Sequence, residues 1–100
     1  MWKAEQIKDL ESLREFLKNY FAGRKVRLYL FGSRARGDET PSSDIDLALE
    51  AQEDISEDIS YLSEVLEESL LPYRVELVDL SKAGRHLRKK VMEEGILWIG

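Results

Sequence analysis

Apolar residues recur along the chain with two spacings, and these spacings predict its helices and strands. Spacings of three and four residues are typical of one face of an amphipathic helix and occur in three segments. The first segment ends at Gly23, and the second lies between Asp54 and Pro72. The third lies between Ser81 and Gly95, and we expect Asp54 and Ser81 to be the N-caps of their helices. The apolar stripe of the first helix consists of Trp2, Ile7, Leu10, Leu13, Phe16, Leu17, Tyr20 and Phe21.

Four further segments are rich in residues that favour β-strands. They read VRLYLF (26–31), DIDLALE (44–50), YRVELVDL (73–80) and ILWI (96–99). Because these strands alternate with the helices, we predict an α/β (α+β) fold in which helices pack on a mixed sheet of about four strands. The loop between the first two strands, GSRARGDETPSS, is predicted to contain one helical turn after Gly32. A loop of this length in a small chain is more often functional than idle.

Length and composition are typical of one soluble globular domain, which we expect to span residues 1–100. Hydrophobic residues make up 43% of the chain and charged residues 35%, a balance that excludes a disordered segment. No apolar run approaches the roughly 20 residues that cross a membrane, and the N-terminus lacks the pattern of a secretory signal. The chain has no cysteine, which excludes disulfides and thiolate metal sites and fits a cytoplasmic location.

The net charge of −5 is distributed unevenly along the chain. Residues 1–37 have a net charge of +5, residues 38–79 of −13 and residues 80–100 of +3. This distribution does not give a uniformly basic surface, so a nucleic acid is not expected as a partner. An acidic block between basic flanks suits a site that holds a cation and an anionic ligand together. The alternative is that the acidic residues around 50–68 only solvate the exposed face of one helix.

A phosphate-binding turn is predicted where the first strand ends. Gly32 allows a ligand to approach the backbone closely, and Ser33 adds a hydroxyl donor. Arg34 and Arg36 add positive charge nearby, so this turn could hold a phosphate chain. The alternative is a purely structural turn, because Gly-Ser turns are common. The segment is not a Walker P-loop, since the sequence has no GxxxxGK[ST] motif.

Asp44 and Asp46 are separated by one residue at the start of the second strand, so their side chains are expected to point to the same face. Two neighbouring carboxylates repel each other unless a cation lies between them, and Mg²⁺ prefers carboxylate oxygens. The sequence therefore predicts a Mg²⁺ site here. The alternative is that Asp44 only ends the loop and that Asp46 lies on a solvated face with Ala48 and Glu50.

The third strand offers a third carboxylate. Glu76 lies between apolar residues in the middle of RVELVDL, which is unusual for a solvent-facing carboxylate. If this strand pairs with DIDLALE, Glu76 could join Asp44 and Asp46. Three carboxylates with one or two Mg²⁺ ions beside a phosphate-binding turn would suit in-line attack on a nucleoside triphosphate, with the third carboxylate accepting a proton. Asp79 is the alternative third acid, and we prefer Glu76.

The segment GSRARG-DETPS-SDIDL resembles the signature of the polymerase β-like nucleotidyltransferases. It contains Gly-Ser, a glycine four residues after the serine, and then Ser-Asp-x-Asp. The short chain, with little beyond this core, resembles the minimal nucleotidyltransferase (MNT) group. By this resemblance Gly32 and Ser33 bind the triphosphate of ATP or another NTP. Arg34, Arg36 and Ser43 are assigned to the same nucleotide site.

The resemblance also implies a metal site and a reaction. Asp44 and Asp46 match the metal-binding aspartates of the family, and Glu76 stands where the family usually has a third aspartate. The three carboxylates would hold Mg²⁺ and act as the catalytic residues. The implied reaction transfers a nucleoside monophosphate, AMP from ATP before others, to a hydroxyl group.

Members of the MNT group are often paired with a small helical HEPN protein, and some act as its antitoxin by transferring AMP to a tyrosine of that toxin. The resemblance therefore implies a HEPN-type partner whose tyrosine accepts AMP. Two alternatives stay open: a non-catalytic antitoxin that neutralises its partner by contact, and a small-molecule nucleotidyltransferase of the aminoglycoside-modifying type. No membrane association is expected, and the sequence leaves homo-oligomerisation open.

Overall fold

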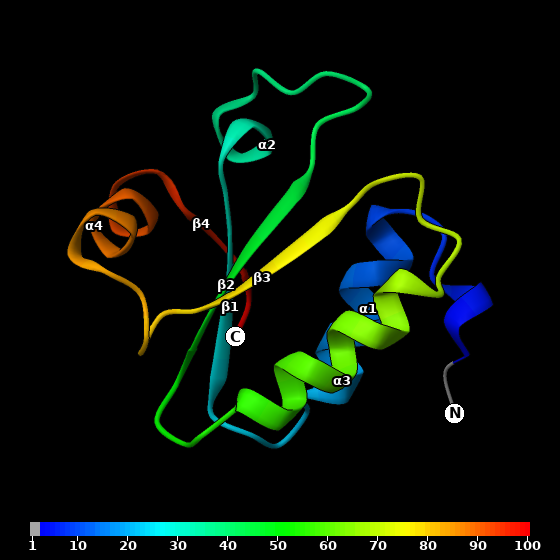
Figure 1. Cartoon of the computed structure of the whole chain (residues 1–100), viewed down its shortest axis with the longest axis horizontal. Coiled ribbons are helices and arrows are strands. Elements are labelled where there is room, and N and C mark those ends of the chain that lie inside the picture. Colours follow the sequence, from blue (N-terminus) through cyan, green and yellow to red (C-terminus); the bar gives the residue numbers. More distant parts are fainter. Residues whose placement is uncertain (1–2) are drawn as a thin grey trace.

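The computed structural model describes residues 3–100, in which four strands form one sheet between helices (Figure 1). The strands are β1 (Val26–Phe31), β2 (Ile45–Ala51), β3 (Val75–Asp79) and β4 (Ile96–Ile99). The helices are the 3-10 helix η1 (Ala4–Gln6), α1 (Leu10–Tyr20), α2 (Ser33–Arg36), α3 (Ser56–Glu67) and α4 (Arg85–Glu94). Trp2, which the sequence assigned to the first helix, lies outside the described residues. The four predicted strands and the helical turn after Gly32 are confirmed, with strand ends that differ by at most two residues.

The sheet is mixed, with the strand order β3-β2-β1-β4. β1 pairs antiparallel with β2 and with β4, whereas β2 and β3 are parallel. The register pairs Asp46 with Phe31 on one side and with Glu76 on the other. Glu76 therefore lies beside Asp46, at the end of the sheet where β1 stops and where β2 and β3 begin. The predicted fold of helices on a mixed sheet is confirmed.

Helices cover both faces of the sheet. α1 and α3 lie together on one face, and α4 lies on the other (Figure 1). The larger core lies under α1 and α3 and includes the fully buried residues Leu13, Leu17, Leu28, Leu47 and Leu62. The smaller core lies under α4 and consists of Phe31, Ala48, Leu80 and Val91. Within residues 3–100, no helix is both long enough and apolar enough to cross a bilayer.

The face of β2 that holds Asp46, Ala48 and Glu50 is covered in its middle and partly open at both ends. Side chains alternate along a strand, so Asp46, Ala48 and Glu50 point to the same face. Ala48 is fully buried on that face, in the core under α4, and Asp46 is partly buried. α4 therefore covers the middle of this face at Ala48, whereas Asp46 and Glu50 on either side are only partly buried, so the structure does not contradict the alternative of a solvated position for Asp46.

The first predicted helix is interrupted, and its N-terminal part forms η1 instead. Asp9 ends the interruption as the N-cap of α1. Asp9 Oδ1 accepts the Ser12 N–H at 2.8 Å, and Ser12 Oγ accepts the Asp9 N–H at 3.1 Å. This reciprocal capping box satisfies backbone donors that a helix start leaves unpaired. Ile7 is nevertheless fully buried, so one apolar stripe of the sequence is divided between two elements.

The two predicted N-caps differ in the structure. Ile55 holds the N-cap position of α3, but Asp54 Oδ1 accepts the N–H and the hydroxyl of Ser56, at 3.0 and 2.6 Å, and so still serves the first turn. The prediction that Ser81 caps the last helix is wrong, because α4 begins only at Arg85. Ser81 instead donates its N–H and its hydroxyl to Asp79 Oδ1, at 2.9 and 2.7 Å. This local turn after β3 uses the serine that a helix cap would need.

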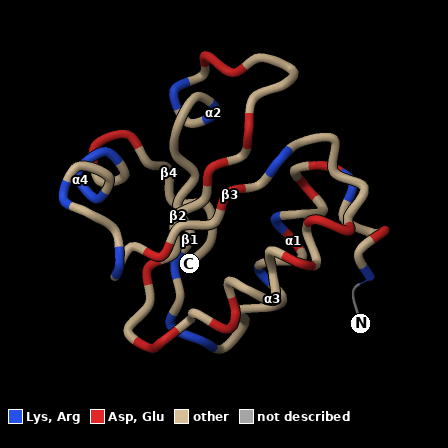
Figure 2. Tube along the Cα trace, viewed as in Figure 1, with Lys and Arg blue, Asp and Glu red and all other residues tan. Residues whose placement is uncertain are grey.

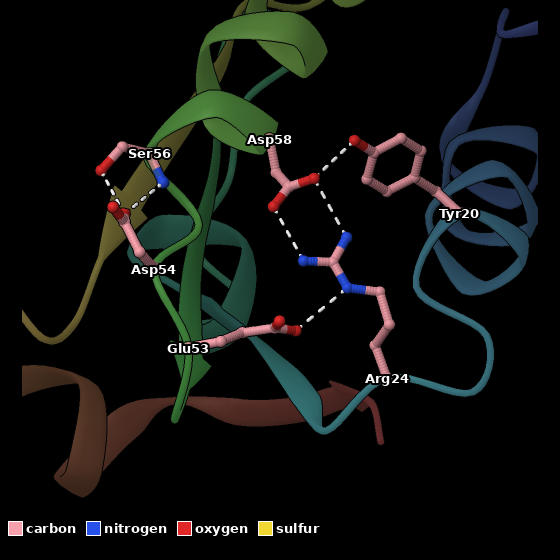
Figure 3. Close-up of polar contacts among 6 residues, drawn as sticks. All are labelled: Tyr20, Arg24, Glu53, Asp54, Ser56 and Asp58. Carbon is pink, nitrogen blue, oxygen red and sulfur yellow. Dashed lines mark hydrogen bonds and ion pairs between the residues drawn. The ribbon is translucent and has the colours of Figure 1, made fainter.

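A polar network links the end of α1 to α3 through Arg24 (Figure 3). The Arg24 guanidinium donates to both oxygens of Asp58, at 3.0 and 2.8 Å, and its Nε donates to Glu53 at 3.0 Å. The Tyr20 hydroxyl donates to Asp58 Oδ1 at 2.7 Å. The hydrogen bonds from Arg24 hold the pKa of Asp58 below its usual range. Burial and the bond to Asp58 raise the pKa of Tyr20 to about 12.

Substituting Asp58→Asn is expected to lower the free energy of unfolding by about 1.5–3 kcal/mol, the range for hydrogen bonds to charged groups. An amide has one oxygen and no charge, so it cannot accept both guanidinium bonds. Because the folded pKa of Asp58 is lowered, this stabilisation is present above the unfolded pKa and is lost as pH falls through the folded value. Urea unfolding at neutral and at acidic pH measures both effects.

Glu53→Gln is the matched control for Asp58→Asn, since Glu53 contacts the same guanidinium through one bond at an exposed position. This exposed contact should contribute less than about 1 kcal/mol. Equal losses for the two variants would contradict the central role of Asp58.

Candidate active site

Gly32 ends β1 and opens the turn that the sequence assigned to phosphate binding. Its backbone has φ +80° and ψ −157°, a conformation that is essentially restricted to glycine. The Gly32 carbonyl accepts the N–H groups of Ala35 and Arg36, both at 3.1 Å. The N–H groups of Ser33 and Arg34 therefore precede the first hydrogen bond of α2, as is usual for the start of a helix. Gly32 is thus the residue that lets the chain turn sharply from β1 into α2.

This turn lies against Asp46 of the neighbouring strand. Phe31 pairs with Asp46 across β1 and β2, and Gly32 follows Phe31 directly. A Cβ atom on Gly32 would overlap Asp46 Oδ2 and lie 3.3 Å from Asp46 Cγ. The structure therefore brings the Gly-Ser turn and the Asp-x-Asp segment together, and only a residue without a side chain leaves room for the carboxylate.

Asp44, Asp46 and Glu76 form a group of carboxylates where the loop enters β2. Asp46 and Glu76 are register partners on adjacent parallel strands, so their side chains point to the same face. Partial burial raises the pKa of Asp46, and the charges of Glu76 and Asp44 together with a hydrogen bond to Glu76 raise it further. Asp44 and Glu76 are exposed, so solvent reaches the group. Figure 2 shows acidic positions along the arm of the loop that enters β2 and near the start of β3, with basic positions on α2 and α4.

Asp79, the alternative third acid, lies away from this group. It pairs with Leu49, three positions farther along the two strands than the pair of Asp46 and Glu76. Alternation also places its side chain on the face opposite to that of Glu76. Of the two candidates, Glu76 is therefore the one beside Asp46. Glu76 is exposed on the edge strand β3 although its sequence neighbours are apolar.

The oxygen donors of these carboxylates suit a hard cation such as Mg²⁺. Within residues 3–100, no three acidic or histidine side chains converge closely enough to form a ready-made cation cage. Mg²⁺ in nucleotide sites commonly takes only one or two carboxylates, and phosphate oxygens and water complete its shell. Burial and, after it, the charges of Glu76 and Asp44 raise the pKa of Asp46, and a bound cation would offset both effects. The donor set therefore fits Mg²⁺ bound together with a nucleotide.

Arg34 and Ser43 are in contact across the loop. Arg34 Nη2 donates to the Ser43 carbonyl at 3.1 Å, and the guanidinium lies 4.3 Å from the centre of the Tyr73 ring. Ser43 Oγ accepts the Thr40 N–H at 2.8 Å. Both side chains are engaged in protein contacts, and their roles in nucleotide binding stay predictions. The sequence pattern gives no signal for Tyr73, because an aromatic residue at the start of a strand is normally taken as core.

Arg36 connects α2 to α4. It forms ion pairs with Asp38 at 3.3 Å and with Glu94 at 3.2 Å, and its nucleotide-binding role also stays a prediction. Lys90 Nζ lies 3.9 Å from the same Glu94 oxygen, and the charge of Lys90 partly offsets the raised pKa of Asp46. α4 therefore places Lys90 and Glu94 near the carboxylates. Lys90 belongs to a basic run that looks like an ordinary solvated helix face in the sequence, so the pattern alone does not assign it to the site.

A cleft of about 500 Å³ lies at the opposite end of β1 and β2, where Val26 and Ala51 contribute to its lining. Both arginines on its wall are paired with protein partners: Arg24 with Asp58 and Glu53, and Arg27 with Glu50 at 3.7 Å. The carboxylates beside Gly32 instead repel one another. We therefore place the candidate active site at the carboxylates and not in this cleft.

The family described as polymerase beta, nucleotidyltransferase, matches residues 11–99 of the chain. The chain is 30% identical over 100 residues to a protein of Methanocaldococcus jannaschii, a match that covers 93% of this chain and all of that protein. It is 32% identical over 84 residues to a second protein of the same organism, covering 81% of this chain and 80% of that protein. Both relatives are named as protein adenylyltransferases, an activity inferred for them.

Solved structures share the fold. A chain from a variant of the MntA–HpeT toxin–antitoxin complex gives a TM-score of 0.70 at 29% identity, covering 92% of this chain and 72% of that chain. A chain from a toxin–antitoxin complex with AMP-PNP gives a TM-score of 0.65 at 28% identity, covering 88% of this chain and 72% of that chain. A third structure is a complex of the tri-AMPylated Shewanella oneidensis HEPN toxin with an MNT antitoxin. A chain from it gives a TM-score of 0.65 at 26% identity, covering 90% of this chain and 68% of that chain. The shared fold and the match over residues 11–99 show that the chain belongs to the polymerase beta-type nucleotidyltransferase family.

Proposed function

We propose that this protein transfers AMP from ATP to a hydroxyl group of a HEPN-type partner protein and thereby acts as its antitoxin. The observation that carries the proposal is the register of β1, β2 and β3, which sets Gly32, Asp46 and Glu76 side by side. The similar proteins support the donor and the partner. Two relatives are named as protein adenylyltransferases, and one similar structure contains an AMPylated HEPN toxin.

In the proposed reaction, the acceptor oxygen attacks the α-phosphorus of ATP and forms one P–O bond. The bond from the α-phosphorus to the bridging oxygen breaks, and pyrophosphate leaves. Glu76 accepts the proton of the attacking hydroxyl, because its exposed carboxylate can be reached by a partner protein. Gly32 and Ser33 hold the β- and γ-phosphates through N–H and hydroxyl donors. Asp44 and Asp46, with Glu76 beside them, would hold one or two Mg²⁺ ions, which would neutralise triphosphate charge.

A tyrosine is the proposed acceptor on the partner. A phenol has a pKa of about 10 and gives up its proton more readily than an aliphatic hydroxyl does. A carboxylate base such as Glu76 would therefore have an easier task with tyrosine than with serine or threonine. Because ATP is the proposed donor, we place the protein in the cytoplasm, where ATP is available.

The test is transfer from ATP labelled in the α-phosphate to a purified HEPN-type partner in the presence of Mg²⁺. We expect label on the partner and, by mass spectrometry, an added AMP on a tyrosine. ATP labelled in the γ-phosphate is the matched control, because pyrophosphate carries that label away. Label from the γ-phosphate would indicate kinase chemistry, and no label from either donor would contradict the proposal.

Neutralisation of the partner by contact alone is the second candidate function. Two observations favour it. Glu76 has a longer side chain than the aspartate that the family usually has at this position, and no ready-made cation cage exists within residues 3–100. An inhibition assay separates the two functions. If AMP transfer is required, the partner stays active when ATP is omitted, whereas contact alone would inhibit the partner without ATP.

A further inference from the structure

Arg34 contacts two other segments that border the carboxylates. Its Nη2 donates to the carbonyl of Ser43 at 3.1 Å, and Ser43 directly precedes Asp44. Its guanidinium lies 4.3 Å from the centre of the Tyr73 ring, at a distance typical of a cation–π contact. Tyr73 lies in the segment that leads into β3 and so toward Glu76. One side chain therefore joins the turn after β1, the end of the loop and the approach to β3.

The loop that Arg34 contacts is held mainly by hydrogen bonds within the loop, and few bonds join it to other elements. Ser43 N–H donates to the Thr40 carbonyl at 3.0 Å, and Thr40 N–H donates to Ser43 Oγ at 2.8 Å, so residues 40–43 form a closed turn. The Arg34 bond fixes this turn to α2. On the other side of Asp44, the Ile45 N–H donates to the Arg74 carbonyl at 2.8 Å and begins the pairing of β2 with β3. Asp44 is thus held between two anchor points, and Arg34 supplies one of them.

The guanidinium is committed to this position. Arg34 Nε is buried and has no hydrogen-bond partner within residues 3–100, so the contacts of the guanidinium with Ser43 and Tyr73 have to offset the cost of burying it. The planar guanidinium can stack on a ring and donate in its own plane at the same time, and a lysine ammonium cannot do both. These contacts favour a structural task for Arg34 over direct contact with the triphosphate.

We propose that Arg34 is a positioning residue, which holds Asp44 at the site through the Ser43 carbonyl and the Tyr73 ring. The effect on catalysis rests on the proposed function, whereas the effect on the loop does not. Arg34 is therefore expected to influence the rate of transfer and the mobility of residues 40–45, and to leave the affinity for ATP nearly unchanged.

The experiment compares Arg34→Lys and Tyr73→Leu with two matched controls. Arg14→Lys makes the same change in an arginine that donates to a backbone carbonyl, that of Trp98, at 3.1 Å. Tyr61→Leu makes the same change in an exposed tyrosine of α3. We expect Arg34→Lys and Tyr73→Leu each to lower kcat by about 10- to 100-fold, with KM for ATP within about twofold of the original value, because misplacing a catalytic group by about 1 Å has an effect of this size.

Tyr73→Phe keeps the ring and is expected to keep the activity. The double variant of Arg34→Lys with Tyr73→Leu is expected to be no slower than the slower single variant, since both changes remove the same support. A higher KM for ATP with unchanged kcat in Arg34→Lys would overturn the proposal and assign Arg34 to phosphate binding. A Tyr73→Leu variant with unchanged kcat would overturn it as well.

Hydrogen exchange supplies a readout that does not need activity. The amides of Thr40, Ser43 and Ile45 are expected to exchange faster in Arg34→Lys and in Tyr73→Leu, and to be unchanged in Arg14→Lys and Tyr61→Leu. Unchanged exchange of these amides in Arg34→Lys would overturn the positioning role. If the protein transfers no AMP at all, the proposed function fails, and the exchange experiment still decides whether Arg34 holds the loop.

Discussion

Substituting Asp46→Asn is expected to lower the rate of AMP transfer by about 10³-fold, a loss typical of removing a group that stabilises charge in a transition state. Asp46 is the acid that lies against Gly32 and pairs with Glu76. An amide has nearly the same shape, but it has no charge and is a poor ligand for Mg²⁺. Single-turnover rates with α-labelled ATP and a saturating amount of the partner measure the loss directly.

The loss of activity in Asp46→Asn should occur without loss of folding. Burial and the charges of Glu76 and Asp44 raise the pKa of Asp46, so the ionised carboxylate opposes folding at neutral pH in the ligand-free protein. Asparagine removes that charge, and we expect the unfolding midpoint in urea to be equal to or higher than the original one. An inactive variant that is also less stable would show that Asp46 supports the fold and would leave its catalytic role without support.

Asp79→Asn is the matched control, since it makes the same chemical change on the adjacent strand. Asp79 points to the opposite face and binds Ser81, and an asparagine oxygen can still accept those bonds. Asp79→Asn should therefore transfer AMP at the original rate. Transfer at the original rate by Asp46→Asn, or a loss in Asp79→Asn as large as that in Asp46→Asn, would contradict the assignment of the site.

The strands and the proximity of the two motif halves could be predicted from the sequence because both depend on local patterns. An apolar run that ends in Gly-Ser and another that starts at Asp-Ile-Asp must meet if they pair as neighbours. The N-cap at Ser81 could not be predicted in the same way. A serine at this position could cap a helix or hydrogen-bond to Asp79. In the structure Ser81 hydrogen-bonds to Asp79, which is only two residues away. Residue propensities do not distinguish these two arrangements, because the serine is hydrogen-bonded in both.

The remaining errors and open choices concern contacts between segments far apart in the sequence. Ala48 is small and fits either a polar or an apolar face, so only the position of α4 shows that it is buried. The choice between Glu76 and Asp79 depends on the register of β2 with β3, which a period-two pattern does not fix. The stacking of Arg34 on Tyr73 joins two loops through tertiary structure. Such contacts decide the details of the site, whereas local patterns decide its location.

Substituting Gly32→Ala is expected to lower both stability and activity, because two independent effects act at one position. The backbone at φ +80° and ψ −157° is a conformation in which a residue with a side chain is strained by about 1–3 kcal/mol. The added methyl group would also overlap Asp46 Oδ2 and has to displace that carboxylate. We therefore expect a free energy of unfolding reduced by at least the strain, and AMP transfer reduced by about 10²-fold or more as Asp46 moves.

Gly37→Ala separates the two effects. Gly37 also has a positive φ, of +81°, but a Cβ atom there would meet no other atom within 4 Å. This variant should lose about 1–2 kcal/mol from strain in the left-handed region and should keep its activity once folded. Urea unfolding and transfer rates, measured on both variants at a temperature where both are folded, test the distinction. Equal transfer rates for Gly32→Ala and Gly37→Ala would contradict the close approach of Gly32 to Asp46, because only that contact distinguishes the effects of the two methyl groups on the carboxylates.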